Sequence, residues 1–158
     1  MGASPHPREE VEATVAKYVE LRERIEQGDA TWPDLAEFFT DDIAYIDPAW
    51  GRINGIDEVK AFMVESMTGL EDWRFPIDFT AIDGDNVVVK WRQILPSGHE
   101  QSGVSTLVYA GDGKFRYEED ILNMGHVNDD LRASGWRPPP GFSFPPSDPD
   151  RDFSVPPS

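Results

Sequence analysis

The stretch TDDIAYIDPAWGRINGIDEVKAF, residues 40–62, decides the fold of this chain. It predicts a short strand, a turn rich in proline and glycine, a second short strand, and a helix that opens near Ile56. Because side chains alternate between the two faces of a strand, Ile43, Tyr45 and Asp47 share one face. A carboxylate beside such side chains, at the rim of an apolar cavity, is suited to become a tuned acid or base.

Helices are expected on both sides of this stretch. Apolar residues spaced three and four apart predict a long helix from Glu9 to Gly28, with Tyr18 on its buried stripe. A second helix is expected to start at Thr31, which can cap it. The third covers about Ile56–Met67, and all three precede the main strands.

After Trp73 the apolar residues recur at every second position, which predicts strands. In the first of these strands Phe75, Ile77 and Phe79 are expected to form the buried face. The later segments are predicted as strands at Val87–Leu95, Ser102–Tyr109 and Lys114–Met124, with a brief closing helix at His126–Ser134. This order predicts an α+β domain in which a cone-like, curved antiparallel sheet wraps around the long N-terminal helix.

The length of 158 residues suits one domain, expected over residues 9–135 between a flexible N-terminus (1–8) and a C-terminal tail (136–158). The tail holds eight of the 14 prolines, which favours extended chain. It also carries aromatic residues such as Trp136 and Phe142, so we expect it to pack along the body or along a partner subunit.

Composition excludes several classes of function. The formal net charge of −16 disfavours a nucleic-acid partner, because the field repels phosphate backbones. There is no cysteine, and no histidine cluster or other metal motif is evident, so neither a metal nor another cofactor is expected. Without a membrane-spanning or export-type apolar run, a cytoplasmic location is expected.

The pattern DDIAYIDP–W–G–xx–G–xxEVxAF, behind a helix carrying AKYVELRERIEQGD, resembles the nuclear transport factor 2-like superfamily over roughly residues 10–135. Its most similar branch is the SnoaL-like and ketosteroid isomerase-like group of small-molecule enzymes. The resemblance implies the cone-like fold, a small apolar ligand and a homodimer formed through the outer sheet face.

Two candidate catalytic residues follow from this resemblance. In ketosteroid isomerases a matching Asp-Pro supplies the general base, which places that role on Asp47; the simpler interpretation is turn chemistry before Pro48. The isomerases also carry a tyrosine at the position of Tyr18, where it donates to the enolate oxygen; an ordinary core tyrosine is the alternative. Their second oxyanion donor falls at about Ser105, and a serine is a weaker donor, which argues against a true steroid isomerase.

Asp120 is the third candidate catalytic residue, because SnoaL-like cyclases place an aspartate in a strand context that resembles EEDILN here. Glu118, Asp120, Leu122 and Met124 share one strand face, and the opposite face carries Asn123. Periodicity leaves open which face points inward. A surface position is the default for an acid in so acidic a chain.

Other residues are candidates for contact with a ligand. These are Tyr45, Trp50, Phe62, Trp91, Arg92, Ser105 and Asn123. Tyr45 and Asp47 resemble the water-holding Tyr-x-Asn of limonene epoxide hydrolase, and Arg92 could match its strand arginine. The Arg-x-Asp of that enzyme reads Arg92–Gln93–Ile94 here, so epoxide hydrolysis is a minor alternative and a surface ion pair is the simpler role for Arg92.

The sequence therefore favours a cofactor-independent enzyme that acts on a small apolar carbonyl compound of the polyketide or steroid kind. Isomerisation, cyclisation and dehydration share the same enolate. The alternative from another class is a non-catalytic binding or assembly module of the same fold. An enclosed pocket that holds both Asp47 and Asp120 would favour the enzyme.

Overall fold

The computed structural model describes residues 5–158. The helices in the first half of the chain are α1 (Arg8–Glu26), the 3-10 helix η1 (Trp32–Phe38) and α2 (Ile56–Met67). The helix α3 (Met124–Ser134) follows the last strand. The strands are β1 (Phe39–Asp47), β2 (Gly51–Asn54), β3 (Ile77–Asp83), β4 (Asn86–Ile94), β5 (Glu100–Gly111) and β6 (Lys114–Leu122).

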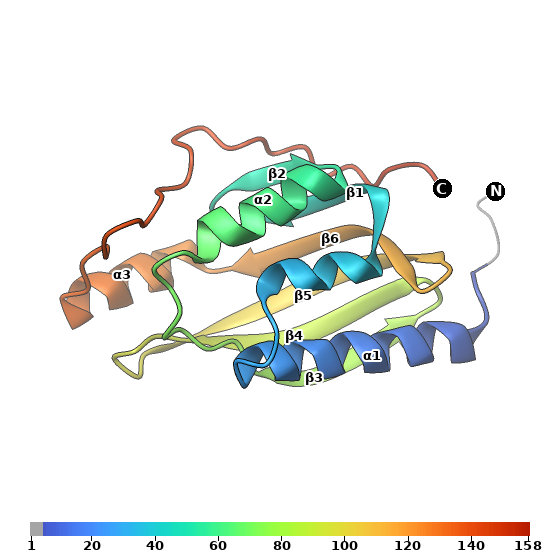
Figure 1. The fold of residues 1–158 in the computed structure, drawn as a ribbon, viewed down its shortest axis with the longest axis horizontal. Coiled ribbons are helices and arrows are strands. Elements are labelled where there is room, and N and C mark those ends of the chain that lie inside the picture. The colour runs from blue at the N-terminus through green and yellow to red at the C-terminus, as the bar shows by residue number, and fades with distance from the viewer. Residues whose placement is uncertain (1–4) are drawn as a thin grey trace.

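The six strands form one sheet in the order β2-β1-β6-β5-β4-β3. Neighbouring strands are antiparallel except for β1 and β6, which run parallel. The sheet curves behind α1 and α2 (Figure 1), which confirms the predicted α+β fold with a long N-terminal helix. The antiparallel prediction is wrong for the β1–β6 pair, because the chain leaves β2 through α2 and returns to the sheet centre only after β3, β4 and β5.

The buried stripe of α1 carries Val11, Val15, Tyr18 and Leu21, as its spacing predicts. Arg22 continues this stripe and is also buried. The stripe packs into a core with the inward side chains of the sheet and the aromatic residues of η1. This packing fixes α1 against the concave face that also bears the pocket described below.

Two local predictions are corrected. The second helix is a 3-10 helix, closed at Thr31 by a reciprocal capping box with Asp34. Phe79 is 57% exposed rather than buried, because the register between β3 and β4 shifts between Ile77 and Phe79. Such a bulge turns the following side chains to the other face of the sheet.

The flexible N-terminus predicted over residues 1–8 lies partly outside the described residues, which begin at 5. The described part is held against the body. The backbone N–H of His6 donates to the Asp85 carboxylate at 2.8 Å, and Arg8 already belongs to α1.

The C-terminal tail packs on the body, as its aromatic residues predict. It leaves α3 and passes over the edge formed by α2 and β2 (Figure 1). Near its end Asp150 forms a β-bridge with Gly51, and the Arg52 guanidinium donates to the backbone oxygens of Asp152 and Ser154 at 2.9 and 2.7 Å. Between α3 and these anchors the tail contributes part of the pocket wall.

Arg52→Ala should loosen the tail. Hydrogen bonds from a charged donor contribute about 1.5–3 kcal/mol each, so losing them should raise the population of detached tail by roughly tenfold or more. Limited digestion with chymotrypsin measures this, because the tail offers Phe142, Phe144 and Phe153. Arg132→Ala, which removes a largely exposed arginine, is the control. Equal cleavage rates for the two variants would show that Arg52 does not hold the tail.

Candidate functional site

A pocket of about 300 Å³ lies between the concave face of the sheet, α2, α3 and the tail. All five tryptophans of the chain contribute to its wall, together with Phe62, Phe75, Phe142 and several methionine and leucine side chains. A few polar groups interrupt this wall, and these are Arg22, Asp47, Ser66, Gln93, Ser105, Glu118, Asp120, Asn128 and Ser143. An apolar hollow with few polar groups is the usual form of a small-molecule site.

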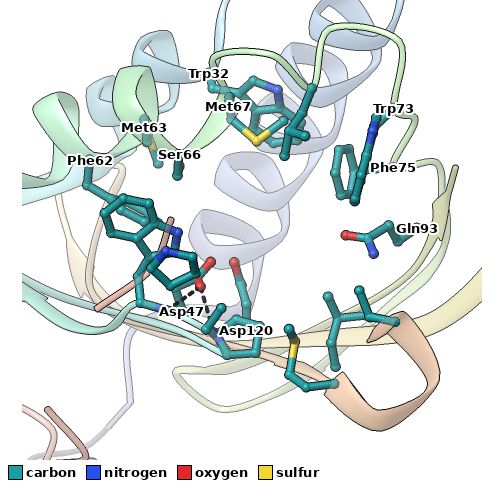
Figure 2. Close-up of a pocket in the computed structure, with 18 of the residues that line it drawn as sticks. Trp32, Asp47, Phe62, Met63, Ser66, Met67, Trp73, Phe75, Gln93 and Asp120 are labelled. Carbon is teal, nitrogen blue, oxygen red and sulfur yellow. Dashed lines mark hydrogen bonds between the residues drawn. The ribbon is translucent and has the colours of Figure 1, made fainter. Parts of the chain in front are cut away.

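Asp47 ends β1 at the floor of the pocket, where Figure 2 shows its side chain with two hydrogen bonds. Its Oδ1 accepts from the backbone N–H groups of Ala49 and Trp50, both at 2.8 Å. Its Oδ2 has no hydrogen-bond partner among residues 5–158 in the structure. Burial raises the pKa of Asp47 to about 6, against the two backbone donors, which lower it. One oxygen is therefore fixed and the other is free to take a proton near neutral pH.

Asp120 lies beside Asp47 because of the strand register. Tyr45 is opposite Glu118 and Ile46 is opposite Glu119, so Asp47 is level with Asp120 on the neighbouring strand. Both carboxyls face the pocket (Figure 2), and the charge of Asp120 also raises the pKa of Asp47.

Both oxygens of Asp120 accept a hydrogen bond. Oδ1 accepts from the Ser105 hydroxyl at 2.5 Å and Oδ2 accepts from the Tyr45 hydroxyl. The Trp91 indole N–H donates to the Ser105 oxygen at 2.8 Å, which directs the Ser105 proton toward Asp120. One donor on each oxygen suits an ionised carboxylate.

Trp91 can reach Ser105 because Gly103 lies under its ring. A Cβ atom at position 103 would lie 2.4 Å from the ring, which is too close for any side chain. Gly103 therefore gives the ring its place, and the ring in turn orients the hydroxyl that binds Asp120.

Glu118 is a second carboxyl on the same face of β6, and it is only 1% exposed. Its Oε1 accepts from the Tyr18 hydroxyl at 3.0 Å, and its Oε2 is buried with no partner among the described residues. Burial, and then the neighbouring charge of Asp120, raise the pKa of Glu118 well above its ordinary value. Glu118 therefore holds its proton to a higher pH than an ordinary glutamate does.

Arg22 brings a positive charge to the wall formed by α1. Its Nη2 donates to the backbone oxygen of Phe75 at 3.0 Å, and its guanidinium lies 5.0 Å from the centre of the Trp32 ring. The Nε atom is buried with no partner in the part of the chain that the structure describes. The positive charge lowers the pKa of Glu118, but less than burial and Asp120 raise it.

The sequence matches the profile of the SnoaL-like domain over residues 15–117, well over half of the chain. This chain belongs to the SnoaL-like domain family. The matched residues end within β6, so α3 and the tail, which complete the pocket wall, lie beyond them. No curated protein sequence matches this SnoaL-like protein.

Solved structures share its nuclear transport factor 2-like fold. A provisionally assigned SnoaL-like polyketide cyclase from Jannaschia sp. CCS1 is 20% identical, with a TM-score of 0.63 over 86% of this chain and 100% of the other. TerC, co-crystallised with polyporic acid, is 22% identical, with a TM-score of 0.58 over 78% and 98%. A protein of unknown function from Mesorhizobium loti is 19% identical, with a TM-score of 0.56 over 77% and 99%. At these identities the similarity establishes the fold.

The SnoaL-like pocket collects most of the residues that the sequence singles out. Asp47 and Asp120 line it, together with the proposed contact residues Tyr45, Trp50, Phe62, Trp91 and Ser105. The face of β6 that carries Glu118 and Asp120 points inward, and the opposite face points outward. Periodicity alone leaves this choice open.

Three of the predicted site residues lie elsewhere. Tyr18 is buried behind the pocket and reaches it only through Glu118. Arg92 points to the outer face of β4, where it pairs with Asp78 and Glu100 at 3.0 and 2.9 Å, because Trp91 and Gln93 occupy the inward positions. Asn123 caps α3 by accepting from the His126 backbone N–H, so its side chain is occupied there.

Arg22, Gln93 and Glu118 also line the pocket, and none of them is among the site residues that the sequence predicts. Each is a polar residue at an inward position of its element, on the stripe of α1 or on the alternating face of a strand. The signal in the sequence is a polar side chain at a position where the helix or strand period predicts an apolar one. Within residues 5–158 no group of three or more acidic or histidine side chains is arranged to hold a metal ion, and no helix there is long and apolar enough to cross a membrane.

Proposed function

We propose that this SnoaL-like protein is a cofactor-independent acid–base enzyme that moves a proton next to the carbonyl group of a small, largely apolar compound. The observation that carries the proposal is Asp47, which has one oxygen fixed by two backbone donors, the other free, and a pKa raised to about 6. A base with a pKa near the working pH is the most effective. The surrounding wall suits a compact substrate of the polyketide or steroid kind.

The charged groups at this end of the pocket then have defined roles. The free oxygen of Asp47 takes the proton from the carbon beside the carbonyl, and negative charge develops on the carbonyl oxygen. The positive charge of Arg22, which lines the pocket, stabilises the charge on that oxygen. Asp120, held by the Tyr45 and Ser105 hydroxyls and level with Asp47, takes the proton from Asp47 and returns it to another carbon of the enolate. Isomerisation, cyclisation and dehydration all begin with this enolate, so the proposal concerns their shared step.

The two alternatives receive less support. For a non-catalytic binding module, a filled fold with its acids in solvent would be expected, whereas Asp47 and Asp120 share one apolar pocket. Epoxide hydrolysis would need the strand arginine beside the acids, and Arg92 lies on the outer face of β4.

Deuterium exchange tests the proposed step without knowledge of the natural substrate. The wild-type protein, incubated in D₂O with 2-tetralone or benzoylacetone, should speed deuterium uptake beside the carbonyl by roughly a hundredfold over the same concentration of acetate. Mass spectrometry follows the uptake, and benzophenone, which has no such hydrogen, is the control. If neither ketone exchanges faster although calorimetry shows that both bind, the proposed chemistry is wrong.

A further inference from the structure

Gln93 lies on the inward face of β4 and lines the pocket, although only 5% of it is exposed. Figure 2 shows its side chain across the pocket from Asp47, with the amide oxygen pointing into the hollow. The proposed mechanism uses the acids at the other end and gives Gln93 no role. A buried amide in an apolar wall needs an explanation, since burying an unsatisfied polar group is costly.

The orientation of this amide is fixed by two residues behind it. Gln93 Nε2 donates to Gln101 Oε1 at 2.8 Å, and Gln101 Nε2 donates to Asp130 Oδ2 at 2.7 Å. Asp130 belongs to α3, and a carboxylate only accepts hydrogen bonds. Gln101 must therefore present its N–H to Asp130 and its oxygen to Gln93. That in turn leaves the oxygen of Gln93, and not its nitrogen, for the pocket.

The Gln93 oxygen accepts no hydrogen bond from any of residues 5–158, and it is not sealed from the pocket. It is thus a fixed acceptor with a vacant lone pair in a wall of tryptophan, phenylalanine and leucine side chains. A hydrogen-bond donor on a bound molecule is the partner that such an oxygen selects.

We propose that Gln93 determines specificity by accepting a hydrogen bond from a hydroxyl or phenol group at the end of the ligand that lies away from Asp47 and Asp120. The inference deepens the proposed function, and rests on it in taking the acids as the reacting end. Gln93 is a binding residue here and takes no part in proton transfer.

The strand register sets the distance between the two ends. Gln93 pairs with Gln101 of β5, and Asp120 pairs with Ser105 of the same strand. These two partners are four residues apart along β5. At about 3.3 Å per residue this is roughly 13 Å along the strand direction, and Gln93 and Asp120 are also two strands apart, on β4 and β6. Side chains that reach into the pocket shorten the gap. A fused-ring or two-ring compound, with a carbonyl at one end and a hydroxyl at the other, spans it.

Two variants distinguish the effect of the Gln93 oxygen as an acceptor from the effect of the space that the side chain fills. Gln93→Met removes the acceptor and keeps a side chain of similar length. Asp130→Asn changes a residue outside the pocket wall. An asparagine can donate to Gln101 as well as accept from it, so both orientations of the two glutamines become satisfied, and Gln93 can then offer either its oxygen or its N–H.

Calorimetric titration with 2-naphthol and 2-methoxynaphthalene tests the proposal, because the two differ in the hydrogen that Gln93 would accept. For the wild-type protein we expect 2-naphthol to bind roughly tenfold more tightly. The ratio should fall to about one in Gln93→Met, and should fall at least threefold in Asp130→Asn. A wild-type ratio near one, or a ratio that both variants leave unchanged, overturns the proposal.

The acids also accept hydrogen bonds, so Asp47→Asn serves as a binding control. A preference that vanishes in Asp47→Asn and survives in the Gln93 and Asp130 variants assigns the naphthol hydroxyl to the acids and contradicts the inference. The naphthol ratio requires no turnover. Failed deuterium exchange with an intact, Gln93-dependent ratio therefore rejects only the proposed chemistry, and the reverse result rejects only the role of Gln93.

Discussion

Asp47→Asn should slow deuterium exchange beside the carbonyl by a factor of about 10²–10⁴, the usual contribution of a positioned general base. Asparagine keeps an oxygen that can accept from the Ala49 and Trp50 backbone N–H groups, so the turn after β1 should be preserved. The variant loses only the free oxygen that takes a proton. Mass spectrometry with the ketone that the wild-type protein exchanges best measures the loss.

The stability of this variant separates a chemical effect from a folding defect. Because burial of Asp47 raises its pKa, the neutral asparagine should leave the thermal midpoint at or slightly above the wild-type value. Asp41→Asn, an exposed acid in the same strand, is the matched control and should exchange at the wild-type rate. Undiminished exchange in Asp47→Asn would remove Asp47 as the base.

Glu118→Gln should stabilise the protein by an amount that grows with pH. The pKa of Glu118 is raised in the folded state, so below about pH 4.3, the ordinary value for glutamate, both states hold the proton and its full contribution is present. Above that pH the unfolded state releases the proton first. The wild-type free energy of unfolding then falls by about 1.4 kcal/mol per pH unit from this group until the folded pKa is reached.

A glutamine at 118 has no such proton to lose, and its oxygen can still accept from Tyr18. Urea unfolding between pH 5 and pH 8 should therefore show a widening gap between the variant and the wild type. Glu65→Gln, an exposed residue of α2, is the control that tracks the general effect of removing one negative charge. A gap that stays constant with pH would mean that Glu118 is already ionised at pH 5.

The fold could be predicted well because its signals are local. The bounds of α2 follow from its apolar spacing, and the strand positions follow from alternation and from turns such as the one at Gly84. The exposure of Phe79 could not be predicted, since the bulge before it depends on pairing with β4. The parallel β1–β6 pair was also beyond reach, because it depends on the order of strands in the sheet.

The candidate site could be predicted only in part, for a related reason. Asp47 stood out because it shares a strand face with Tyr45, and Asp120 because EEDILN resembles a strand of SnoaL-like cyclases; the strand register brings the two level. Arg22 and Gln93 were missed because their place among the apolar positions indicates only that they face inward, and not that they face a cavity. The tail's place in the pocket wall depends on anchors such as Arg52, to which a proline-rich segment gives no periodic clue.

The most direct test of the account is the titration of Asp47 itself, which needs no substrate. Carboxyl ¹³C NMR of the wild-type protein and of Asp47→Asn between pH 3 and pH 8 identifies its resonance by difference. We predict an aspartate resonance with a midpoint near pH 6 that disappears in the variant. A midpoint near the ordinary value of 3.8 would contradict the account, because the pocket would then not raise the pKa of Asp47 toward that of an effective base.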